Sequence, residues 1–381
     1  MYTVGWRSVG AAEGVGQCRA RECCGMAPSV IKDAKIQLKG HSNWCRDAVW
    51  SPDGDMIGTA CADNFLRVFQ CDGTEAWKHK HDDWVWSCDF SFTPKRKRLV
   101  SACLDGKIRV FDAALGRKLL EIQAHEKDKT VNSVALSPHG GEFVLSGSYD
   151  KTARIHTVGN GKQVLCIDCF TGPVLSVLWT VDGTHAIAAS STGQLVVADA
   201  RTGSTVQRND RAHSGKVNGM AVSPDGKLLV TAGADKCSKV WFLGDEGAQG
   251  QCSLIATLKV ADEAAAAAFS PDQLLLAVAC ADGIVRVFHA TDGWPEVARI
   301  KGHSDEVNAV SFTAKGARTL LATASDDRNA SIFDLSPISV QLKVAAAKAG
   351  KAAAAVTGAP SAGLVPQEPS VGDPADMDGL D

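Results

Sequence analysis

Histidine, a hydroxyl residue and aspartate, the side chains that build a hydrolytic triad, occur together several times in this chain. His213, Thr231 and Asp235 are one such set. Nearly all of these residues occupy corresponding positions of a repeated pattern, and the sequence contains no G-x-x-x-x-G-K-[ST], H-E-x-x-H or G-x-S-x-G motif. We therefore expect a structural role for them and no enzymatic activity. The alternative, an enzyme, would need a further cluster of carboxylates or a metal site.

The repeated pattern has a period of 42 to 47 residues. Its units open with a histidine, as in HSNWCRDAVWSPDG from His41 and HSGKVNGMAVSPDG from His213, and similar units begin at His81, His125 and His303. Each unit continues with a strand of small residues, an aspartate turn and an apolar strand that in most units ends in an aromatic residue, as in ACADNFLRVF. Two degenerate units surround GPVLSVLWTVDG and AAAAAFSPDQ. The seven turn positions are Asp63, Asp105, Asp150, Thr192, Asp235, Asp282 and Asp327.

Over residues 35 to 335 this pattern resembles the WD40-repeat family. The resemblance implies an all-β fold, a seven-bladed WD40 β-propeller with disordered N- and C-terminal extensions. It also implies that the histidine, hydroxyl, turn aspartate and strand-end tryptophan of a unit form a buried hydrogen-bonded network. One unit has the complete set, His213, Thr231, Asp235 and Trp241, and four more retain the histidine and the aspartate: His41 and Asp63, His81 and Asp105, His125 and Asp150, His303 and Asp327. The fourth unit has lost the set, so we expect blade 5 to be the most rigid and blade 4 to depend on apolar packing alone.

The sequence predicts three regions: a disordered N-terminal extension (1–29), the propeller (30–336) and a low-complexity disordered tail (337–381). Met26 could be the true start. Because each repeat of the family opens with the outer strand of the preceding blade, we expect Lys35–Gly40 to complete the last blade and close the ring. The segment Ile338–Val344, which also alternates, is the alternative for that position.

The candidate partner-binding residues follow from the same register. In WD40 proteins the residues that flank the start of each inner strand project from one face of the ring. In blades 1 and 2 these positions hold three tryptophans and an arginine, residue types that are enriched in binding hot spots. The predicted partner-binding residues are therefore Trp44, Arg46, Trp84 and Trp86, with Leu104 and Tyr149 beside them. The alternatives are a partial core role for Trp84 and Trp86, and recognition of methylated lysine by the aromatic rings.

Composition limits the partners further. A net charge of −3 gives no basic field for direct binding of nucleic acid or membrane, and no 18-residue apolar span is present. We expect a monomeric propeller that binds other proteins in a multisubunit complex, without cofactor or metal. Thirteen cysteines lack a disulfide spacing, and Cys166 and Cys169 form a lone C-x-x-C, so we expect reduced thiols and a cytoplasmic protein.

Two short motifs offer other interpretations. Lys95–Arg98 is a basic run that could direct nuclear import, although it falls in an expected hairpin turn. In WD40 adaptors of cullin-type ubiquitin ligases, a strand-end W-D-x-R docks the ligase. This chain has Asp199 and Arg201 but Ala198 in place of the tryptophan and Thr192 at the turn, which weakens an adaptor role.

Overall fold

The computed structural model describes residues 28–93, 96–244, 252–291 and 293–345. Most of the expected N-terminal extension, and the expected tail beyond residue 345, lie outside these residues. In the described ranges no helix has the length and apolarity to cross a membrane. The chain divides into two units, Met1–Ser339 and Val340–Asp381.

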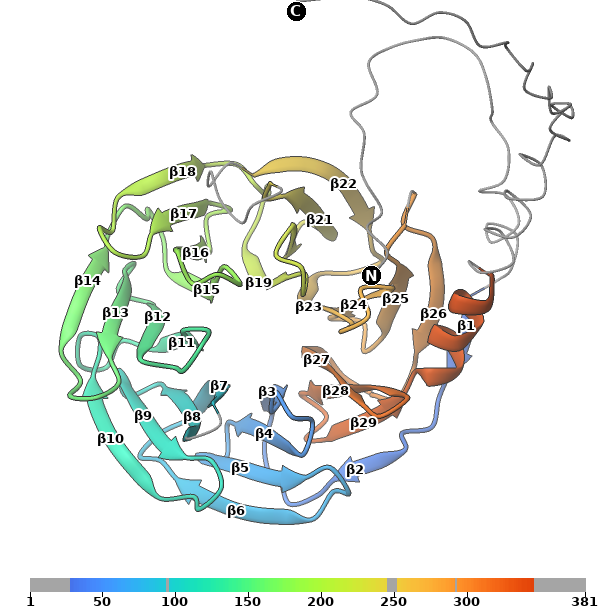
Figure 1. Ribbon diagram of the computed structural model, residues 1–381, viewed down its shortest axis with the longest axis horizontal. Coiled ribbons are helices and arrows are strands. Elements are labelled where there is room, and N and C mark those ends of the chain that lie inside the picture. Colours follow the sequence, from blue (N-terminus) through green and yellow to red (C-terminus); the bar gives the residue numbers. More distant parts are fainter. Residues whose placement is uncertain (1–27, 94–95, 245–251, 292, 346–381) are drawn as a thin grey trace, which may run out of the picture. The chain divides into compact units, whose positions relative to one another are not determined.

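The first unit holds seven β-sheets, arranged as blades around a central channel (Figure 1). This confirms the all-β, seven-bladed propeller that the sequence predicts. Blades 1 to 4 consist, from the channel outward, of β3 (Cys45–Trp50), β4 (Met56–Cys61), β5 (Phe65–Gln70) and β6 (Glu75–Lys80); β7 (Val85–Thr93), β8 (Arg96–Cys103), β9 (Lys107–Asp112) and β10 (Lys118–Gln123); β11 (Val131–Leu136), β12 (Phe143–Ser148), β13 (Ala153–Thr157) and β14 (Gln163–Ile167); β15 (Val174–Trp179), β16 (His185–Ser190), β17 (Leu195–Asp199) and β18 (Thr205–Asn209).

Blades 5 to 7 follow the same order, with one additional strand on blade 6. Their strands are β19 (Val217–Val222), β20 (Leu228–Gly233), β21 (Cys237–Phe242) and β22 (Ser253–Lys259); β23 (Ala264–Phe269), β24 (Leu275–Cys280), β25 (Val285–His289), β26 (Glu296–Ile300) and β1 (Ser29–Ile31); β27 (Val307–Lys315), β28 (Arg318–Ser325), β29 (Ala330–Asp334) and β2 (Ile36–Leu38).

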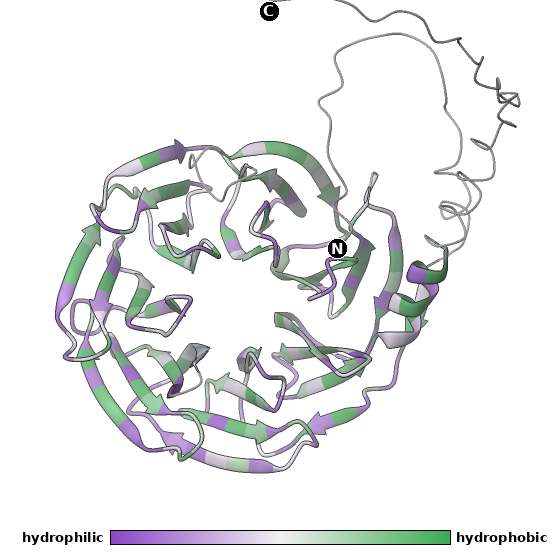
Figure 2. Ribbon diagram, viewed as in Figure 1, coloured by the Kyte–Doolittle hydropathy of each residue, from purple (hydrophilic) through white to green (hydrophobic). Residues whose placement is uncertain are grey.

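The burial of each strand follows from its place in the blade. The second strands β4 (MIGTAC), β16 (HAIAAS) and β24 (LLAVAC) are buried at every residue because neighbouring blades cover both of their faces. Their small and apolar side chains suit this position. Outermost strands such as β6 (EAWKHK) alternate between exposed and half-buried residues, and Figure 2 shows the corresponding mixture of polar and apolar residues at the rim.

The ring closes through the N-terminal segment, as the repeat offset predicts. β2 pairs antiparallel with β29, so that the first strand of the ring completes the last blade. Before it, β1 pairs in parallel with β26 of blade 6, through Ser29 to Ala298 and Ile31 to Ile300. The N-terminal segment therefore ties blades 6 and 7 together.

The alternative closing segment, Ile338–Val344, is not a strand. Residues 336–345 are helical, and they include the first residues of the expected tail. Asp334 Oδ1 accepts the backbone N–H of Ser336, and Pro337 follows, a pattern that starts a helix. Ser339 Oγ donates to Asp272 Oδ2 of blade 6 at 2.7 Å.

Candidate protein-interaction surface

Blades 3, 5 and 7 contain the histidine network that the family resemblance implies. In blade 5, His213 Nδ1 donates to Asp235 at 2.8 Å, and the Thr231 hydroxyl donates to His213 Nε2 at 2.7 Å. Trp241 Nε1 donates to the same hydroxyl oxygen at 2.9 Å. A Cβ atom on Gly233 would lie 2.2 Å from His213 Nδ1, so only glycine fits beside the ring. The corresponding pairs are His125 with Asp150 and His303 with Asp327, both at 2.9 Å.

Blades 1 and 2 differ from this expectation, because the turn aspartate pairs with an arginine four residues later in place of the histidine. In blade 3, by contrast, Asp150 pairs with Arg154 and also keeps its bond to His125. Arg67 pairs with Asp63 at 2.8 Å, and Arg109 pairs with Asp105 at 2.7 Å. A guanidinium binds a carboxylate more strongly than a neutral imidazole does. The Nδ1 atoms of His41 and His81 face backbone carbonyls instead, at Leu38 and His79.

The two displaced histidines are neutral. Burial, followed by the charge of Arg67, lowers the pKa of His41 to about 4. Burial, followed by the charge of Arg109, lowers the pKa of His81 to about 3. Each ring still bonds to the hydroxyl of its unit, at Thr59 and Ser101. Blade 6, where the histidine is missing, has the same kind of ion pair between Asp282 and Arg286.

Blade 4 does not depend on apolar packing alone, which corrects the expectation from the sequence. The hydroxyl of Thr192 lies 3.0 Å from that of Thr171 and 2.9 Å from that of Ser190. Gln194, which is buried, accepts the backbone N–H of Thr171 and donates to Asp210. A glutamine two residues after the turn position thus replaces the lost aspartate. The repeat pattern does not reveal it, because Gln194 lies outside the four positions of the network.

The same end of the ring presents a set of equivalent side chains. In every blade, the residue one position before the innermost strand accepts, through its carbonyl, the N–H of the residue just before the turn position. These seven acceptors are Trp44, Trp84, Thr130, Pro173, Lys216, Glu263 and Glu306, and we call them the rim positions.

A β-bulge lies next to each rim position. The register of every innermost strand shifts by one residue near its start, as between Cys45 and Asp47 of β3. A bulged residue redirects its side chain. The bulged residues are Arg46, Trp86, Asn132, Leu175, Asn218, Ala265 and Asn308.

The predicted residues of blades 1 and 2 form one cluster at these positions. Trp44 and Trp84 meet edge to face with ring centroids 5.8 Å apart, and Trp84 and Trp86 follow at 6.2 Å. Arg46 stacks on Trp86, with Cζ 4.3 Å from the ring centroid, and its Nη1 lies 3.1 Å from Asp326 Oδ1 of blade 7. We call Trp44, Arg46, Trp84 and Trp86 the tryptophan patch.

The members of the tryptophan patch differ in solvent exposure and in their bonds to the rest of the ring. Trp44 is 42% exposed, whereas Trp84 and Trp86 are partly buried. Trp86 Nε1 donates to Asn132 Oδ1 at 3.0 Å, which anchors its ring to blade 3. Of the two neighbours, Leu104 is half-buried beside Trp84, and Tyr149 is 57% exposed one blade further along. Trp44 is therefore the most exposed tryptophan of the patch, and Trp86 is the one anchored to a neighbouring blade.

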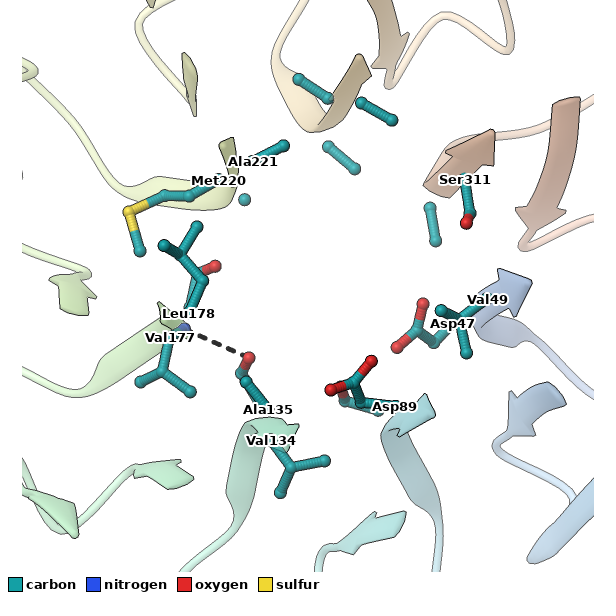
Figure 3. Close-up of a pocket in the computed structure, with 18 of the residues that line it drawn as sticks. Asp47, Val49, Asp89, Val134, Ala135, Val177, Leu178, Met220, Ala221 and Ser311 are labelled. Carbon is teal, nitrogen blue, oxygen red and sulfur yellow. Dashed lines mark hydrogen bonds between the residues drawn. The ribbon is translucent and has the colours of Figure 1, made fainter. Parts of the chain in front are cut away.

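The central channel contains a cavity of about 680 Å³. Most of the residues that line it are apolar, but Asp47 and Asp89 point into it from adjacent blades (Figure 3). Asp47 accepts the N–H of Cys88 at 3.0 Å, and Asp89 accepts that of Leu136 at 2.7 Å. Both carboxylates thus join neighbouring blades, as the Ser133 hydroxyl does in blade 3.

Burial raises the pKa of both carboxyl groups. It raises the pKa of Asp47 to about 6 and that of Asp89 to about 7. In the described part of the chain, no three histidine, cysteine or acidic side chains are placed to hold a metal ion. All ten cysteines in that part are free thiols.

The two short motifs are built into the fold. Of the basic run, Arg98 is buried and its guanidinium donates to the carbonyls of Gly140 and Gly141, and Arg96 pairs with Glu142. Lys95 lies outside the described residues. Asp199 accepts the N–H groups of Arg201 and Thr202, and so caps the turn between β17 and β18.

Comparison with known proteins identifies similar repeats. The family model "WD domain, G-beta repeat" matches residues 116–157, 204–241, 253–289 and 294–334, and the model "Anaphase-promoting complex subunit 4 WD40 domain" matches residues 48–128. WD repeat-containing protein 1 of Gallus gallus is 24% identical over 305 residues, which cover 77% of this chain and 48% of that protein.

Other relatives are named for different assemblies. Eukaryotic translation initiation factor 3 subunit I of Culex quinquefasciatus is 24% identical over 341 residues, which cover 79% of this chain and 97% of that protein. U3 small nucleolar RNA-associated protein 15 homolog of Xenopus tropicalis is 25% identical over 240 residues, 62% of this chain and 44% of that protein. The chain spans about half the length of several relatives that it matches.

Proposed function

This chain belongs to the WD40-repeat family, and from that premise we propose that it is a non-catalytic scaffold that binds other proteins in a multisubunit complex. We assign the platform to the propeller, residues 30–336, and the contact site to the tryptophan patch. Leu104 and Tyr149 extend the site along the rim. The binding unit is a single propeller, without cofactor or metal.

One observation carries the proposal: the tryptophan patch exposes aromatic surface that the fold does not need for its own packing. The rim positions of the other described blades hold Thr130, Pro173, Lys216 and acidic residues, and those blades close equally well. A rim tryptophan that is 42% exposed leaves much of its ring free to contact a partner, and truncation of such anchors typically costs a complex 2 kcal/mol or more. Arg46 is held in place by Asp326 and Trp86, so it is ordered before a partner arrives.

The relatives support the general class of function rather than a pathway. One is named as a subunit of a translation initiation factor and another as a protein associated with a small nucleolar RNA, so that the same fold occurs in unlike assemblies. We propose a cytoplasmic location. Import through the basic run Lys95–Arg98 is the less favoured option, because Arg98 is buried and its guanidinium is bonded to backbone carbonyls of the next blade.

Two other functions are less well supported by the geometry. Asp199 caps a turn, as Asp112 does in blade 2, which accounts for its presence without a cullin-type ligase. Asp47 and Asp89 are the paired carboxylates that an enzyme could use, but backbone N–H groups of the next blades occupy them.

The test is affinity purification with mass spectrometry on four forms of the full chain. We expect the wild type and Thr130→Ala, a change at the same rim position of blade 3, to recover the same specific partners. Trp44→Ala and Arg46→Glu should lose them while melting within a few degrees of the wild type. If both variants retain the partners of the wild type, the tryptophan patch is not the contact site.

A further inference from the structure

The rim positions of blades 6, 7, 1 and 2 form a continuous arc over four of the seven blades, and their side chains are acidic or aromatic. In that order around the ring they are Glu263, Glu306, Trp44 and Trp84. The shared backbone hydrogen bond makes these positions equivalent, so the two acidic side chains start from the same place in their blades as the two tryptophans. An acidic half therefore adjoins an aromatic half.

The acidic half carries more negative charge than the ion pairs of the described residues neutralise. Asp326, just before the turn of blade 7, is bound by Arg46, and Asp262 pairs with Lys236 at 3.0 Å. Glu263 and Asp305 are exposed, and Glu306 is half-buried between them. Burial, and then the charges of Asp326 and Glu263, raise the pKa of Glu306, against the opposing effect of Arg46. The side chain of Glu306 therefore lies in a negative field.

Arg46 fixes the boundary between the two halves. Its guanidinium stacks on Trp86 on one side and pairs with Asp326 on the other, and Asn308 also donates to Asp326. The boundary is thus cross-linked before binding, and a ligand meets an ordered surface. Apolar and acidic contacts lie within reach of a few residues of extended chain, which rises about 3.3 Å per residue.

Building on the proposed function, we propose that the partner presents a basic segment, with an apolar side chain placed on Trp44 and Trp84 and a neighbouring lysine or arginine directed to Glu306 and Glu263. The apolar side chain provides the anchor, because exposed indole rings are covered on binding. The basic residue provides the orientation, since charge complementarity favours one direction of the chain and raises the association rate. An acidic or neutral segment would leave Glu263 and Glu306 without a counter-charge.

The probe for this proposal is a phage-displayed library of random 12-residue peptides, selected on the full-length wild-type protein. We expect the selected peptides to be enriched in lysine or arginine next to an aliphatic or aromatic residue. The strongest peptide should lose its binding to Trp44→Ala. It should bind Glu263→Lys on the order of tenfold more weakly, because attraction becomes repulsion at a separation of about 6 Å in water.

The control is Glu142→Lys, an equal change of charge at an exposed residue between β11 and β12, whose ion-pair partner Arg96 is also 58% exposed. It should bind the peptide as the wild type does. Binding to the wild type should also weaken as salt rises from about 0.05 to 0.5 M, because exposed charge pairs are screened.

The outcomes separate the two proposals. Peptides that need Trp44 but are neutral or acidic, or that bind Glu263→Lys as well as the wild type, would overturn the basic segment and leave the scaffold standing. If no selected peptide depends on Trp44, the contact site itself is contradicted, and the basic segment with it.

Discussion

Replacement of Asp63 by alanine should be among the most destabilising changes in the turn networks, although its unit lacks the complete set of four residues. Asp63 and Arg67 lie 2.8 Å apart with side chains 4% and 5% exposed. Removal of the aspartate leaves a buried guanidinium whose next carboxylate, Glu75, is 3.7 Å away. Loss of one partner of a buried ion pair costs about 3–5 kcal/mol.

The comparison is Asp235→Ala in blade 5. There the side chain left behind is His213, a neutral donor, and an unsatisfied buried donor costs about 1–3 kcal/mol. Urea unfolding at pH 7, followed by tryptophan fluorescence, gives both free energies. The double variant Asp63→Ala/Arg67→Met removes the stranded charge and should recover much of the loss. If Asp63→Ala costs no more than Asp235→Ala, or if the double variant is no better than the single, the argument from the unpaired charge is refuted.

Three further predictions concern stability. Burial raises the pKa of Asp89 to about 7, so the folded protein keeps a proton on this carboxyl that the unfolded chain releases above about pH 4. The contribution of Asp89 to the free energy of unfolding therefore falls as the pH rises from about 4 to about 7. In urea titrations, the free energy of unfolding of Asp89→Asn should fall less between about pH 5 and pH 8 than that of the wild type. Deletion of 1–39 removes β1 and β2 and should lower the melting temperature, whereas deletion of 1–25 spares both strands and should leave it unchanged; equal effects in thermal melts would contradict the closure through β2. Gln194→Ala removes a buried side chain with bonds to two segments and should cost about 2 kcal/mol, more than Thr192→Ala, as measured by urea unfolding; the reverse order would show that the glutamine is not the centre of the blade 4 network.

The repeat in the sequence was enough to predict the blades, because the turn positions recur with the period of a single supersecondary unit. The register within each unit also gave the rim positions, including Trp44 and Trp84. Whether a turn aspartate pairs with the histidine or with an arginine of its blade did not follow from the register. Arg67 and Arg109 are visible in the sequence, but so is Arg154 of blade 3, which pairs with Asp150 without displacing His125. Whether the arginine replaces the histidine at the carboxylate therefore depends on the packed blade.

Other features depend on contacts that sequence reasoning does not reach. Arg46 meets Asp326 across 280 residues, because the first and last blades are neighbours only after the ring closes. The helix over 336–345 was missed for a different reason. Its alternating apolar residues suit a strand, and the start signal of Asp334, Ser336 and Pro337 outweighs that pattern.

The most direct test of the central claim is the accessibility of Trp44 in the free protein and in the complex recovered from cells, measured by hydroxyl-radical footprinting. Leu115, 73% exposed in the turn between β9 and β10, serves as the reference. We expect the oxidation of Trp44 and Trp84 to fall strongly in the complex while that of Leu115 is unchanged. Equal oxidation of Trp44 with and without its partners would contradict the assignment of this surface as the contact site.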